Sequence, residues 1–508
     1  MIELTVWRAL ALAAQRAGNK VALRCGARHL THLQLDAAAN QLGHALLARG
    51  LQRGDRLAVV LPNCMEYVVI AIACAKAGLT MVTLNYRFTT SEFAVQLQDC
   101  GALALIYGEA FAHAVLPAAQ GLQVRVFLRH GESADLAHDS LTQAIDSAPN
   151  TPLAVDVGEL DVFYLGYTSG TTGRPKGAMV TQRNRALAYH YWALEFGLSE
   201  RDVSLHCGPF HHTAPFTFTL AQLYLGGEVV ILEHFDALEA LQQIQTHQVT
   251  WMFAVPFMYE RILALGGQTL AKHDWRSLRM MISGGSALTT QTKEGVLATF
   301  PACGLHEFYG ATEAGVITNL RPQDQARKRR CVGRPVFDTE VAIRDESGQD
   351  VPVGEIGEIW LRGPTIFSGY YKAPEKNQAV FSGDWCTLGD VGRIDEEGYV
   401  YIVDRSKDVI KSGGVNVYPV EIEEVLLEQT GVMEVAVVGI ADSTWGEAVH
   451  AVVVLAPQAV LDPEVLLARC RERLAGYKVP KSVEFRTELP RNANGKVLKR
   501  VLREAFVV

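Results

Sequence analysis

The chain has 508 residues, a formal net charge of −8, and a composition that is 49% hydrophobic and 20% charged. This length exceeds what one hydrophobic core normally supports, so two or more domains are expected. The acidic balance argues against nucleic acid as a main partner, and no segment predicts a transmembrane helix. The nine cysteines are scattered without metal-site spacing, which predicts free thiols and a cytoplasmic protein.

Helical and strand patterns alternate through the first 330 residues. The first 21 residues predict an amphipathic helix, not a signal peptide, because Arg16 and Lys20 interrupt a short apolar run. Helices are then expected at 37–47 and 65–77, and strands at 56–61, 80–84, 103–107, 124–128, 162–165, 229–232, 249–255 and 280–282. This rhythm predicts an α/β fold with mostly parallel sheets packed with helices.

The pattern changes after about Gly333. Short strands separated by turn residues predict a β-rich subdomain that ends near Val403. A polar break at 404–408 precedes helices at 420–427 and 463–474 and strands at 435–440 and 449–454. The sequence therefore predicts a large N-terminal domain at 1–403 and a small α+β C-terminal domain at 404–508.

One stretch, from Tyr167 to Gly177, is rich in glycine, hydroxyl and basic residues. Consecutive backbone N–H groups in such a turn form an anion-binding concavity, and hydroxyls and a lysine add to it. The candidate phosphate-binding residues are Thr168, Ser169, Gly170, Thr171, Thr172, Gly173 and Lys176. The glycine spacing is not that of the Walker motif, and a flexible surface loop is the alternative. A strand at 162–165 leads directly into the stretch, which favours a polyphosphate site.

Further clusters follow in a definite order along the chain. They are Phe210-His-His-Thr-Ala214, Ser283-Gly-Gly-Ser286, Phe308-Tyr-Gly-Ala-Thr-Glu313, Leu388-Gly-Asp390, Asp404-Arg405, Lys411-Ser-Gly-Gly414, Asn416-Val-Tyr-Pro419 and Asn494-Gly-Lys496. Each is weak alone. Together with the loop they cover nearly the whole chain, and the series resembles the adenylate-forming superfamily of acyl- and aryl-CoA synthetases, peptide-synthetase adenylation domains and beetle luciferases.

The resemblance implies an ATP site in the large domain. The loop would hold the β- and γ-phosphates, with Thr312 as a further phosphate-contacting hydroxyl. Glu313 would hold Mg²⁺, a cation that prefers carboxylate and phosphate oxygens. Tyr309 would stack on adenine. The other implied nucleotide-binding residues are Gly284, Gly285, Ser286 and Gly310, with Asp390 and Arg405 at the ribose.

The same resemblance implies a mobile C-terminal domain. Lys496 would bridge the carboxylate and the α-phosphate during adenylation, although a terminal lysine in a loop is otherwise expected to be solvated. Residues 404–407 would form the hinge, with Lys407 as the pivot and Gly413 and Gly414 facing the acyl-adenylate. His212 would be an aromatic gate near the carboxylate and the thiol entry. The tail segment 475–480 also looks like that of CoA synthetases.

Several positions depart from the superfamily pattern. His211 stands where Phe is usual, which leaves open which of the paired histidines acts, and Leu388 stands where Thr or Ser is usual. Pro215 replaces a common Gly, and Val415 a common Glu or Phe. None removes a group assigned to the chemistry.

The implied function is an ATP-dependent carboxylate–CoA ligase, with ATP, Mg²⁺ and CoA as cofactors and a fatty or aromatic acid as substrate. The acid pocket is expected beneath 283–285, with residues 189–192, Phe216 and Phe257 among its walls. The alternatives are an acyl-AMP or aryl-AMP ligase that serves a carrier protein, a luciferase-like oxygenase and a non-catalytic nucleotide sensor. The basic run 327–330 is either a solvated loop or a docking patch for CoA or a carrier. The sequence leaves room for a homodimer.

Overall fold

The computed structural model describes residues 3–132, 138–168, 176–442, 444–491 and 497–506. The chain divides into two compact units, Met1–Glu340 with Arg362–Cys386, and Val341–Leu361 with Thr387–Val508. Over the described ranges the strands form four sheets. The domain boundary expected at residues 403 and 404 stays a prediction.

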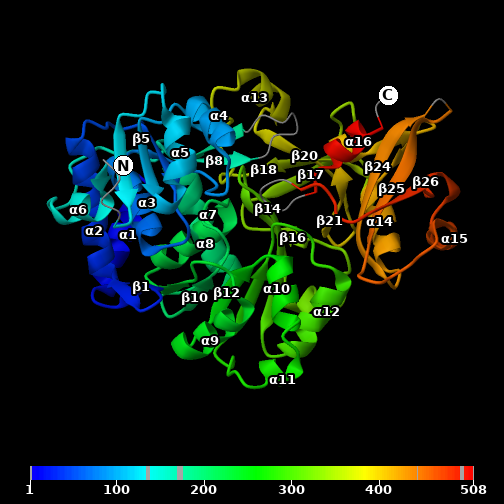
Figure 1. Cartoon of the computed structure of the whole chain (residues 1–508), viewed down its shortest axis with the longest axis horizontal. Helices are drawn as coiled ribbons and strands as arrows, with labels where there is room; N and C mark the ends of the chain where they lie inside the picture. The colour runs from blue at the N-terminus through cyan, green and yellow to red at the C-terminus, as the bar shows by residue number, and fades with distance from the viewer. Residues whose placement is uncertain (1–2, 133–137, 169–175, 443, 492–496, 507–508) are drawn as a thin grey trace. The chain divides into compact units, whose positions relative to one another are not determined.

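A seven-stranded sheet in the first unit carries the loop that the sequence singled out. Its order is β7-β6-β5-β3-β4-β8-β9, and every pairing is parallel except that of β8 with β9. The strands are β3 Arg56–Val60, β4 Thr80–Thr83, β5 Ala104–Gly108, β6 Val126–His130, β7 Asp139–Ser140, β8 Val162–Thr168 and β9 Lys176–Thr181. The helices beside it are α2 His32–Ala48, α3 Met65–Ala77, α4 Thr90–Cys100, η1 Glu109–Phe111, α5 Ala112–Ala119 and α6 Leu141–Asp146. Figure 1 shows these helices, in blue and cyan, around the strands.

Helix α3 shows why the sequence pattern was readable here. Every residue of α3 except Glu66 is buried, so the segment is apolar on all sides. Its one buried charge, Lys76, donates to Asp36 and, at 2.8 Å, to Asn40 Oδ1 of α2. Gly78 ends the helix with φ 68°, a left-handed conformation that glycine adopts without strain.

The second sheet of the first unit has nine strands in the order β16-β15-β14-β13-β12-β10-β11-β1-β2. The six strands from β14 to β1 are parallel to their neighbours, and β15, β16 and β2 are antiparallel. The strands are β1 Val21–Cys25, β2 Arg28–Thr31, β10 Val203–His206, β11 Glu228–Ile231, β12 Trp251–Ala254, β13 Met280–Ser283, β14 Gly304–Ala311, β15 Gly315–Leu320 and β16 Arg334–Pro335. The helices are α1 Val6–Ala17, α7 Gln182–Phe196, α8 Thr213–Tyr224, α9 Ala237–His247, α10 Pro256–Leu263, α11 Gly267–Leu270, α12 Thr290–Thr299 and η2 Pro322–Asp324.

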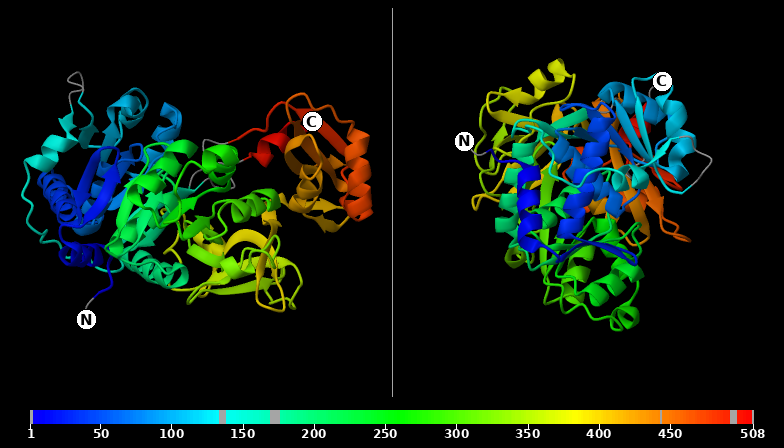
Figure 2. Two further views of the ribbon diagram at one scale, coloured as in Figure 1. Left: turned by 90° about the horizontal axis from the view of Figure 1, so that it is seen from below. Right: turned by 90° about the vertical axis from the view of Figure 1, so that its left-hand side faces the viewer.

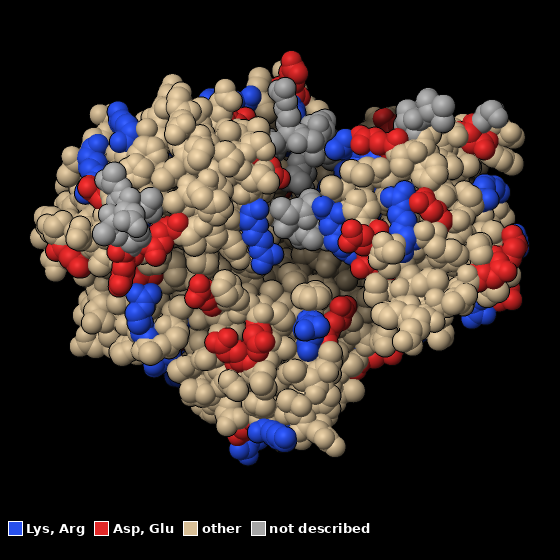
Figure 3. Space-filling view, viewed as in Figure 1, with Lys and Arg blue, Asp and Glu red and all other residues tan. Residues whose placement is uncertain are grey.

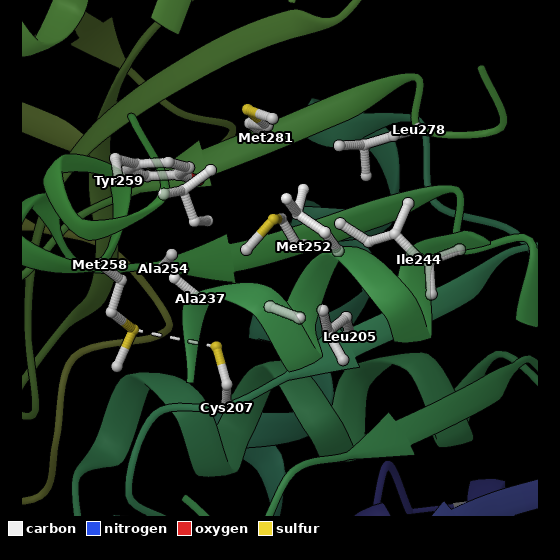
Figure 4. Packing of buried hydrophobic residues seen from close by; sticks show 14 of the residues in the cluster. Leu205, Cys207, Ala237, Ile244, Met252, Ala254, Met258, Tyr259, Leu278 and Met281 are labelled. Atoms are coloured by element: carbon white, nitrogen blue, oxygen red, sulfur yellow. Dashed lines mark hydrogen bonds between the residues drawn. The ribbon is translucent and has the colours of Figure 1, made fainter. Parts of the chain in front are cut away.

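One face of this sheet packs against α9 and α10. In Figure 4 Leu205, Met252 and Met281, from three adjacent strands, lie on the same side as Ile244 of α9 and Tyr259 of α10. The Cys207 thiol lies 3.8 Å from the Met258 sulfur. This apolar layer covers one face of β10, β12 and β13, and ligands of open α/β sheets bind at the carboxyl ends of the parallel strands.

A five-stranded sheet follows, in which β19 and β21 are both antiparallel to β20. Its order is β17-β18-β20-β19, with β21 paired to β20. The elements are β17 Glu340–Arg344, β18 Gly357–Arg362, α13 Pro374–Val380, β19 Phe381–Ser382, β20 Trp385–Ile394, β21 Val400–Arg405 and η3 Ser406–Asp408. This is the β-rich part that the sequence predicted after Gly333.

The last sheet has an α+β arrangement. Its order is β23-β22-β25-β24, with β26 parallel to β25. The elements are β22 Ile410–Ser412, β23 Val415–Val417, α14 Pro419–Leu427, β24 Val432–Asp442, β25 Gly446–Leu455, α15 Pro463–Arg473, η4 Gly476–Lys478, β26 Ser482–Arg486 and α16 Lys499–Glu504. Alternate residues serve opposite faces, because Val437 packs with α14 and α15 whereas Val438 packs with Leu502 of α16. Figure 2 shows these helices beside the orange strands.

The predicted fold class is confirmed: mostly parallel sheets packed with helices, a β-rich part and an α+β C-terminal part. No helix within the described ranges is long and apolar enough to cross a membrane. Acidic and basic side chains are scattered in small groups over the face drawn in Figure 3.

Candidate active site

The hairpin β8–β9 brackets the candidate phosphate loop. Thr168, the last residue of β8, pairs with Lys176, the first of β9, so the two ends of the loop lie side by side. Ser169, Gly170, Thr171, Thr172 and Gly173 lie outside the described residues, and so does Lys496. The predicted strand before the loop is confirmed and extends to Thr168.

Glu313 lies at the centre of a cluster of polar groups in the turn between β14 and β15. It is 7% exposed, and its Oε1 accepts hydrogen bonds from the hydroxyls of Tyr370 at 2.8 Å and Thr168 at 3.5 Å. The Lys176 Nζ lies 5.1 Å from the centre of the Tyr370 ring. The structure thus brings together three residues predicted from two separate motifs, and it adds Tyr370.

Sequence reasoning missed Tyr370. The residue stands in Gly369-Tyr370-Tyr371, 57 positions after Glu313, and nothing local shows that the two side chains meet. A tyrosine after glycine near the end of the large domain was the only available signal. The main chain strengthens the same contact, because the Phe367 N–H donates to the Glu313 carbonyl at 2.7 Å.

Thr312, the predicted phosphate-contacting hydroxyl, pairs with Thr213 at the start of α8, with 2.9 Å between the two Oγ1 atoms. Gly166 of β8 makes room for this pair. A Cβ built on Gly166 would stand 2.4 Å from the Thr312 methyl carbon and 3.3 Å from the Thr213 hydroxyl. The close approach therefore requires glycine at position 166.

The paired histidines precede α8. Their rings lie 4.4 Å apart between centroids, and the His211 ring also packs edge-on against Tyr86. Burial, followed by the charges of His212 and Arg87, lowers the pKa of His211 to about 2, and burial followed by Arg87 lowers the pKa of His212 to about 4. Both rings are therefore neutral at neutral pH, which suits an uncharged aromatic gate and not a cationic catalyst.

The glycine turn after β13 and the segment after β14 lie side by side. Ser283 pairs with Glu307 in the parallel register, so Gly284 and Gly285 leave the sheet beside the strand that continues to Tyr309. A Cβ on Gly284 would stand 2.4 Å from the Phe308 ring, and Gly285 has φ 88°. A Cβ on Gly310 would meet the Gly315 carbonyl oxygen at 2.3 Å. Ser286 is exposed at this turn. Gly285 is exposed as well, whereas Gly284 is buried against Phe308.

Asp390 and Arg405, the expected ribose ligands, belong to the second unit. They face each other on β20 and β21, and the Arg405 Nε lies 2.5 Å from the Asp390 Oδ1. Asp390 is buried, whereas the Arg405 side chain is 40% exposed. Thr387, the neighbour of Leu388 on β20, is buried, and its Oγ1 donates to Glu358 at 2.8 Å and accepts from the Gly389 N–H at 3.1 Å.

The expected hinge contains one buried carboxylate. Asp404 Oδ1 accepts from the Arg405 N–H at 2.7 Å and Oδ2 from the Val420 N–H at 3.1 Å, so Asp404 ties the segment to the start of α14. Burial raises the pKa of Asp404. Lys407 is exposed in η3. Gly413 and Gly414 form the turn between β22 and β23 with φ 60° and 81°, values that favour glycine.

The structure also gives the exposure of the expected pocket walls and of two residues of the basic run. Phe257, one of the expected pocket walls, is 60% exposed on α10, whereas Tyr189, Trp192 and Phe216 are buried. In the basic run, Lys328 is buried and Arg327 pairs with Asp324 at 3.1 Å. Those two charges are therefore engaged within the protein.

Two family models match the chain, the AMP-binding enzyme family over residues 10–371 and the AMP-binding enzyme C-terminal domain over residues 421–496. The chain belongs to the AMP-binding enzyme family, and the predicted membership of the adenylate-forming superfamily is confirmed.

Relatives match over almost the whole chain. A feruloyl-CoA synthase of Amycolatopsis sp is 38% identical over 496 residues, which are 97% of this chain and 97% of that protein. The long-chain-fatty-acid–CoA ligase FadD13 of Mycobacterium tuberculosis (strain CDC 1551 / Oshkosh) is 34% identical, covering 94% of this chain and 93% of that one. The crystal structure of ATP-bound MatB from Rhodopseudomonas palustris superposes with a TM-score of 0.90 at 32% identity, covering 99% of each chain.

Proposed function

We infer that the chain is an ATP-dependent carboxylate–CoA ligase. It activates a fatty or aromatic acid as acyl-AMP with release of pyrophosphate, then transfers the acyl group to CoA. The observation that carries this is the meeting of Glu313, Thr168 and Tyr370 beside Lys176, at the mouth of the loop that the family uses for phosphates. Relatives named as CoA ligases of aromatic and fatty acids support the assignment.

The residues around Glu313 suit Mg²⁺. This buried carboxylate forms no ion pair with any described lysine or arginine, and its described side-chain partners are two hydroxyls. Oxygen ligands around an uncompensated carboxylate are what a hard divalent cation prefers. Mg²⁺ bound there would offset negative charge on the phosphate oxygens. The role of the chain is to hold Glu313 in one orientation, through the hydrogen bonds that Tyr370 and Thr168 donate to its Oε1.

Each remaining group has a proposed task in the first step. A carboxylate oxygen of the acid attacks the α-phosphorus, and the bond to pyrophosphate breaks. Lys176 and the loop hydroxyls hold the leaving phosphates, Thr312 donates to a phosphate oxygen, and Lys496 opposes the charge that accumulates between carboxylate and phosphate. Tyr309 stacks on adenine, while Asp390 and Arg405 bind the ribose.

In the second step the CoA sulfur attacks the acyl carbon, and AMP leaves with one oxygen from the acid. His212 gates the thiol as a neutral ring. Lys407 is the pivot of the C-terminal domain, and Gly413 and Gly414 face the acyl-adenylate. The cytoplasmic location and the homodimer stay predictions.

We place aromatic acids ahead of long fatty chains as substrates. The interior beside Gly284 is filled by fixed rings: Phe218 stacks on Phe253 with centroids 5.2 Å apart and contacts Trp192 at 4.5 Å and Phe308 at 5.7 Å. Such rings pack well against a flat substrate and leave little room for a long flexible chain.

The test is a panel of cinnamic, benzoic and fatty acids assayed for AMP and thioester with and without CoA. We expect AMP and thioester in a 1:1 ratio, dependent on CoA, with the highest kcat/KM on an aromatic acid. Acid-dependent ATP–pyrophosphate exchange without a CoA product would instead identify a ligase that serves a carrier protein. Absence of both signals would indicate a nucleotide sensor.

A further inference from the structure

Arg185 is a buried cation with unsatisfied nitrogens. It lies on α7, is 2% exposed, and donates from Nη2 to the Tyr164 hydroxyl at 2.8 Å. Its Nε and Nη1 have no hydrogen-bond partner in the described part of the chain, and it forms no ion pair with a described carboxylate. The guanidinium otherwise faces aromatic rings, 5.3 Å from the centre of Tyr164 and 5.9 Å from that of Trp192.

Burial of a guanidinium costs free energy unless a hydrogen-bond acceptor pairs with its N–H groups. A guanidinium keeps its proton inside a protein, so Arg185 cannot escape burial by becoming neutral. Cation–π contacts return less free energy than the burial of an unpaired ion costs. The unsatisfied N–H groups of Nε and Nη1, on different edges of the guanidinium, therefore point to an oxygen acceptor.

The guanidinium lies close to residues that we expect to contact phosphate. A Cβ on Gly315, two residues after Glu313, would stand 3.8 Å from the Arg185 Nη1 and 3.4 Å from the Trp192 ring. Because position 315 is glycine, no side chain covers that nitrogen from this direction. On the other side, the Tyr164 ring lies 3.0 Å from a Cβ built on Gly166, the residue that closely approaches Thr312.

A second unsatisfied group lies on the same face of α7. The hydroxyl of Tyr189, one turn after Arg185, is buried without a hydrogen-bond partner among the described residues. The Tyr189 ring packs edge-on against Trp192 with centroids 5.8 Å apart. Residues at i, i+4 and i+7 of a helix share one face. The Arg185 guanidinium, the Tyr189 hydroxyl and the Trp192 indole therefore lie on one face of α7.

We propose that Arg185, assisted by the Tyr189 hydroxyl, binds an oxygen acceptor on the acid substrate at the end remote from the reacting carboxylate. The proposal rests on the proposed function and names the substrate class: planar acids that carry a hydroxyl, ether or second carboxylate oxygen. Trp192 supplies the apolar surface for the ring between the two ends. The guanidinium selects the substrate and takes no part in the bond changes.

The experiment compares three acids of one shape, 4-methylcinnamate, 4-hydroxycinnamate and 4-carboxycinnamate, in acid-dependent AMP formation. The wild-type enzyme should prefer at least one oxygen-bearing acid over the methyl acid by about 10-fold or more in kcat/KM, because a site built to hydrogen-bond an oxygen rejects its apolar isostere. A preference for 4-hydroxycinnamate identifies a neutral acceptor, and a preference for 4-carboxycinnamate identifies an anionic one. Arg185→Met should remove that preference while retaining activity on the methyl acid, and Arg185→Lys should keep part of it.

Two outcomes would overturn the proposal. One is a wild-type enzyme that does not distinguish the three acids or favours the methyl acid. The other is an Arg185→Met enzyme with the wild-type ratio, or with equal losses on all three, which would mean that Arg185 is only structural. If Arg185→Met does not fold, Tyr189→Phe keeps the ring and must lower the same ratio; an unchanged ratio counts against the proposal. Failure of the proposed function is distinct, since then no acid supports AMP formation.

Discussion

Glu313 is oriented by hydrogen bonds from the hydroxyls of neighbouring residues. A carboxylate that holds a divalent cation must keep one oxygen aimed at the metal, and the shorter of the two side-chain hydrogen bonds to Glu313 within the described residues comes from Tyr370 at 2.8 Å. Tyr370 also lies against Lys176 through its ring. One tyrosine thus aligns the expected metal ligand with the expected phosphate ligand.

Tyr370→Phe should lower adenylation while leaving the fold intact. The change removes one hydrogen bond to a charged group, worth about 1.5–3 kcal/mol, so we expect a loss of about 10- to 100-fold in ATP–pyrophosphate exchange and a higher Mg²⁺ requirement. Tyr371→Phe, at the next position, is the control and should behave as wild type. An unchanged Mg²⁺ dependence in Tyr370→Phe would show that the tyrosine does not orient Glu313.

His206 makes the fold sensitive to acid. It is fully buried on β10, and burial lowers its pKa to about 3. Below pH 6.5 the unfolded chain binds a proton that the folded protein does not, so stability is present above that pH and falls as the pH decreases. The Nε2 of His206 lies 3.1 Å from the Ser204 hydroxyl, a contact that glutamine can reproduce.

His206→Gln should therefore lose less stability on acidification. Between pH 6.5 and pH 5 the difference from wild type amounts to about 2 kcal/mol in the free energy of unfolding, at about 1.4 kcal/mol per pH unit for one proton. Urea denaturation at the two pH values measures it, with the exposed residue His234 changed to Gln as the control. Parallel pH dependences of wild type and His206→Gln would refute this explanation.

At the level of elements, strand β8 of the hairpin β8–β9 lies close to the turn between β14 and β15 because residue 166 is a glycine without a side chain. Strand β8 passes close enough to Thr312 that only glycine at 166 avoids a clash. The Thr312 methyl and the Thr213 hydroxyl are short side chains that cannot swing away, so a larger residue must displace strand or turn.

Gly166→Ala should disturb the Thr213–Thr312 pair directly. We expect a destabilisation of about 1–3 kcal/mol from overpacking, and a larger loss in pyrophosphate exchange than stability alone explains. Gly267→Ala is the matched control, because a Cβ there meets nothing within 4 Å and alanine favours the helix α11. Thermal unfolding and exchange assays on both variants decide. A wild-type rate of pyrophosphate exchange in Gly166→Ala would mean that the Thr213–Thr312 pair can shift without loss of activity.

The elements themselves were largely predictable from local patterns. Helix α3 begins and ends where the apolar run and Gly78 indicate, and β13 and α14 differ from the expected ranges by one residue. Strands were less well bounded: β8 runs three residues past the expected end and β24 extends at both ends, because edge and hairpin pairing stabilises residues that lack an apolar pattern.

The partners within the site could not be predicted in the same way. The contact of Tyr370 with Glu313 spans 57 positions and that of Thr312 with Thr213 spans 99. Each depends on the order of strands in a sheet, as does the pairing of β1 with β11 across some 200 residues of chain. The unsatisfied nitrogens of Arg185 are visible only once every neighbour is placed.

At the scale of the whole molecule, the proposed chemistry divides between the two units. The first contains the loop ends, Glu313 and the neutral histidines, and the second contains Asp390, Arg405 and the hinge. Two successive half-reactions with different nucleophiles suit a protein that presents different residues of one domain to each. The intermediate common to both halves is acyl-AMP, and the account depends on it.

Transfer of ¹⁸O tests that intermediate most directly. An aromatic acid labelled with ¹⁸O in its carboxylate is turned over with ATP, Mg²⁺ and CoA, and the ¹⁸O content of each product is measured by mass spectrometry. If a carboxylate oxygen attacks the α-phosphorus, each AMP formed carries one ¹⁸O and the pyrophosphate carries none. Label in inorganic phosphate or pyrophosphate, or unlabelled AMP beside a labelled thioester, would contradict the acyl-adenylate route.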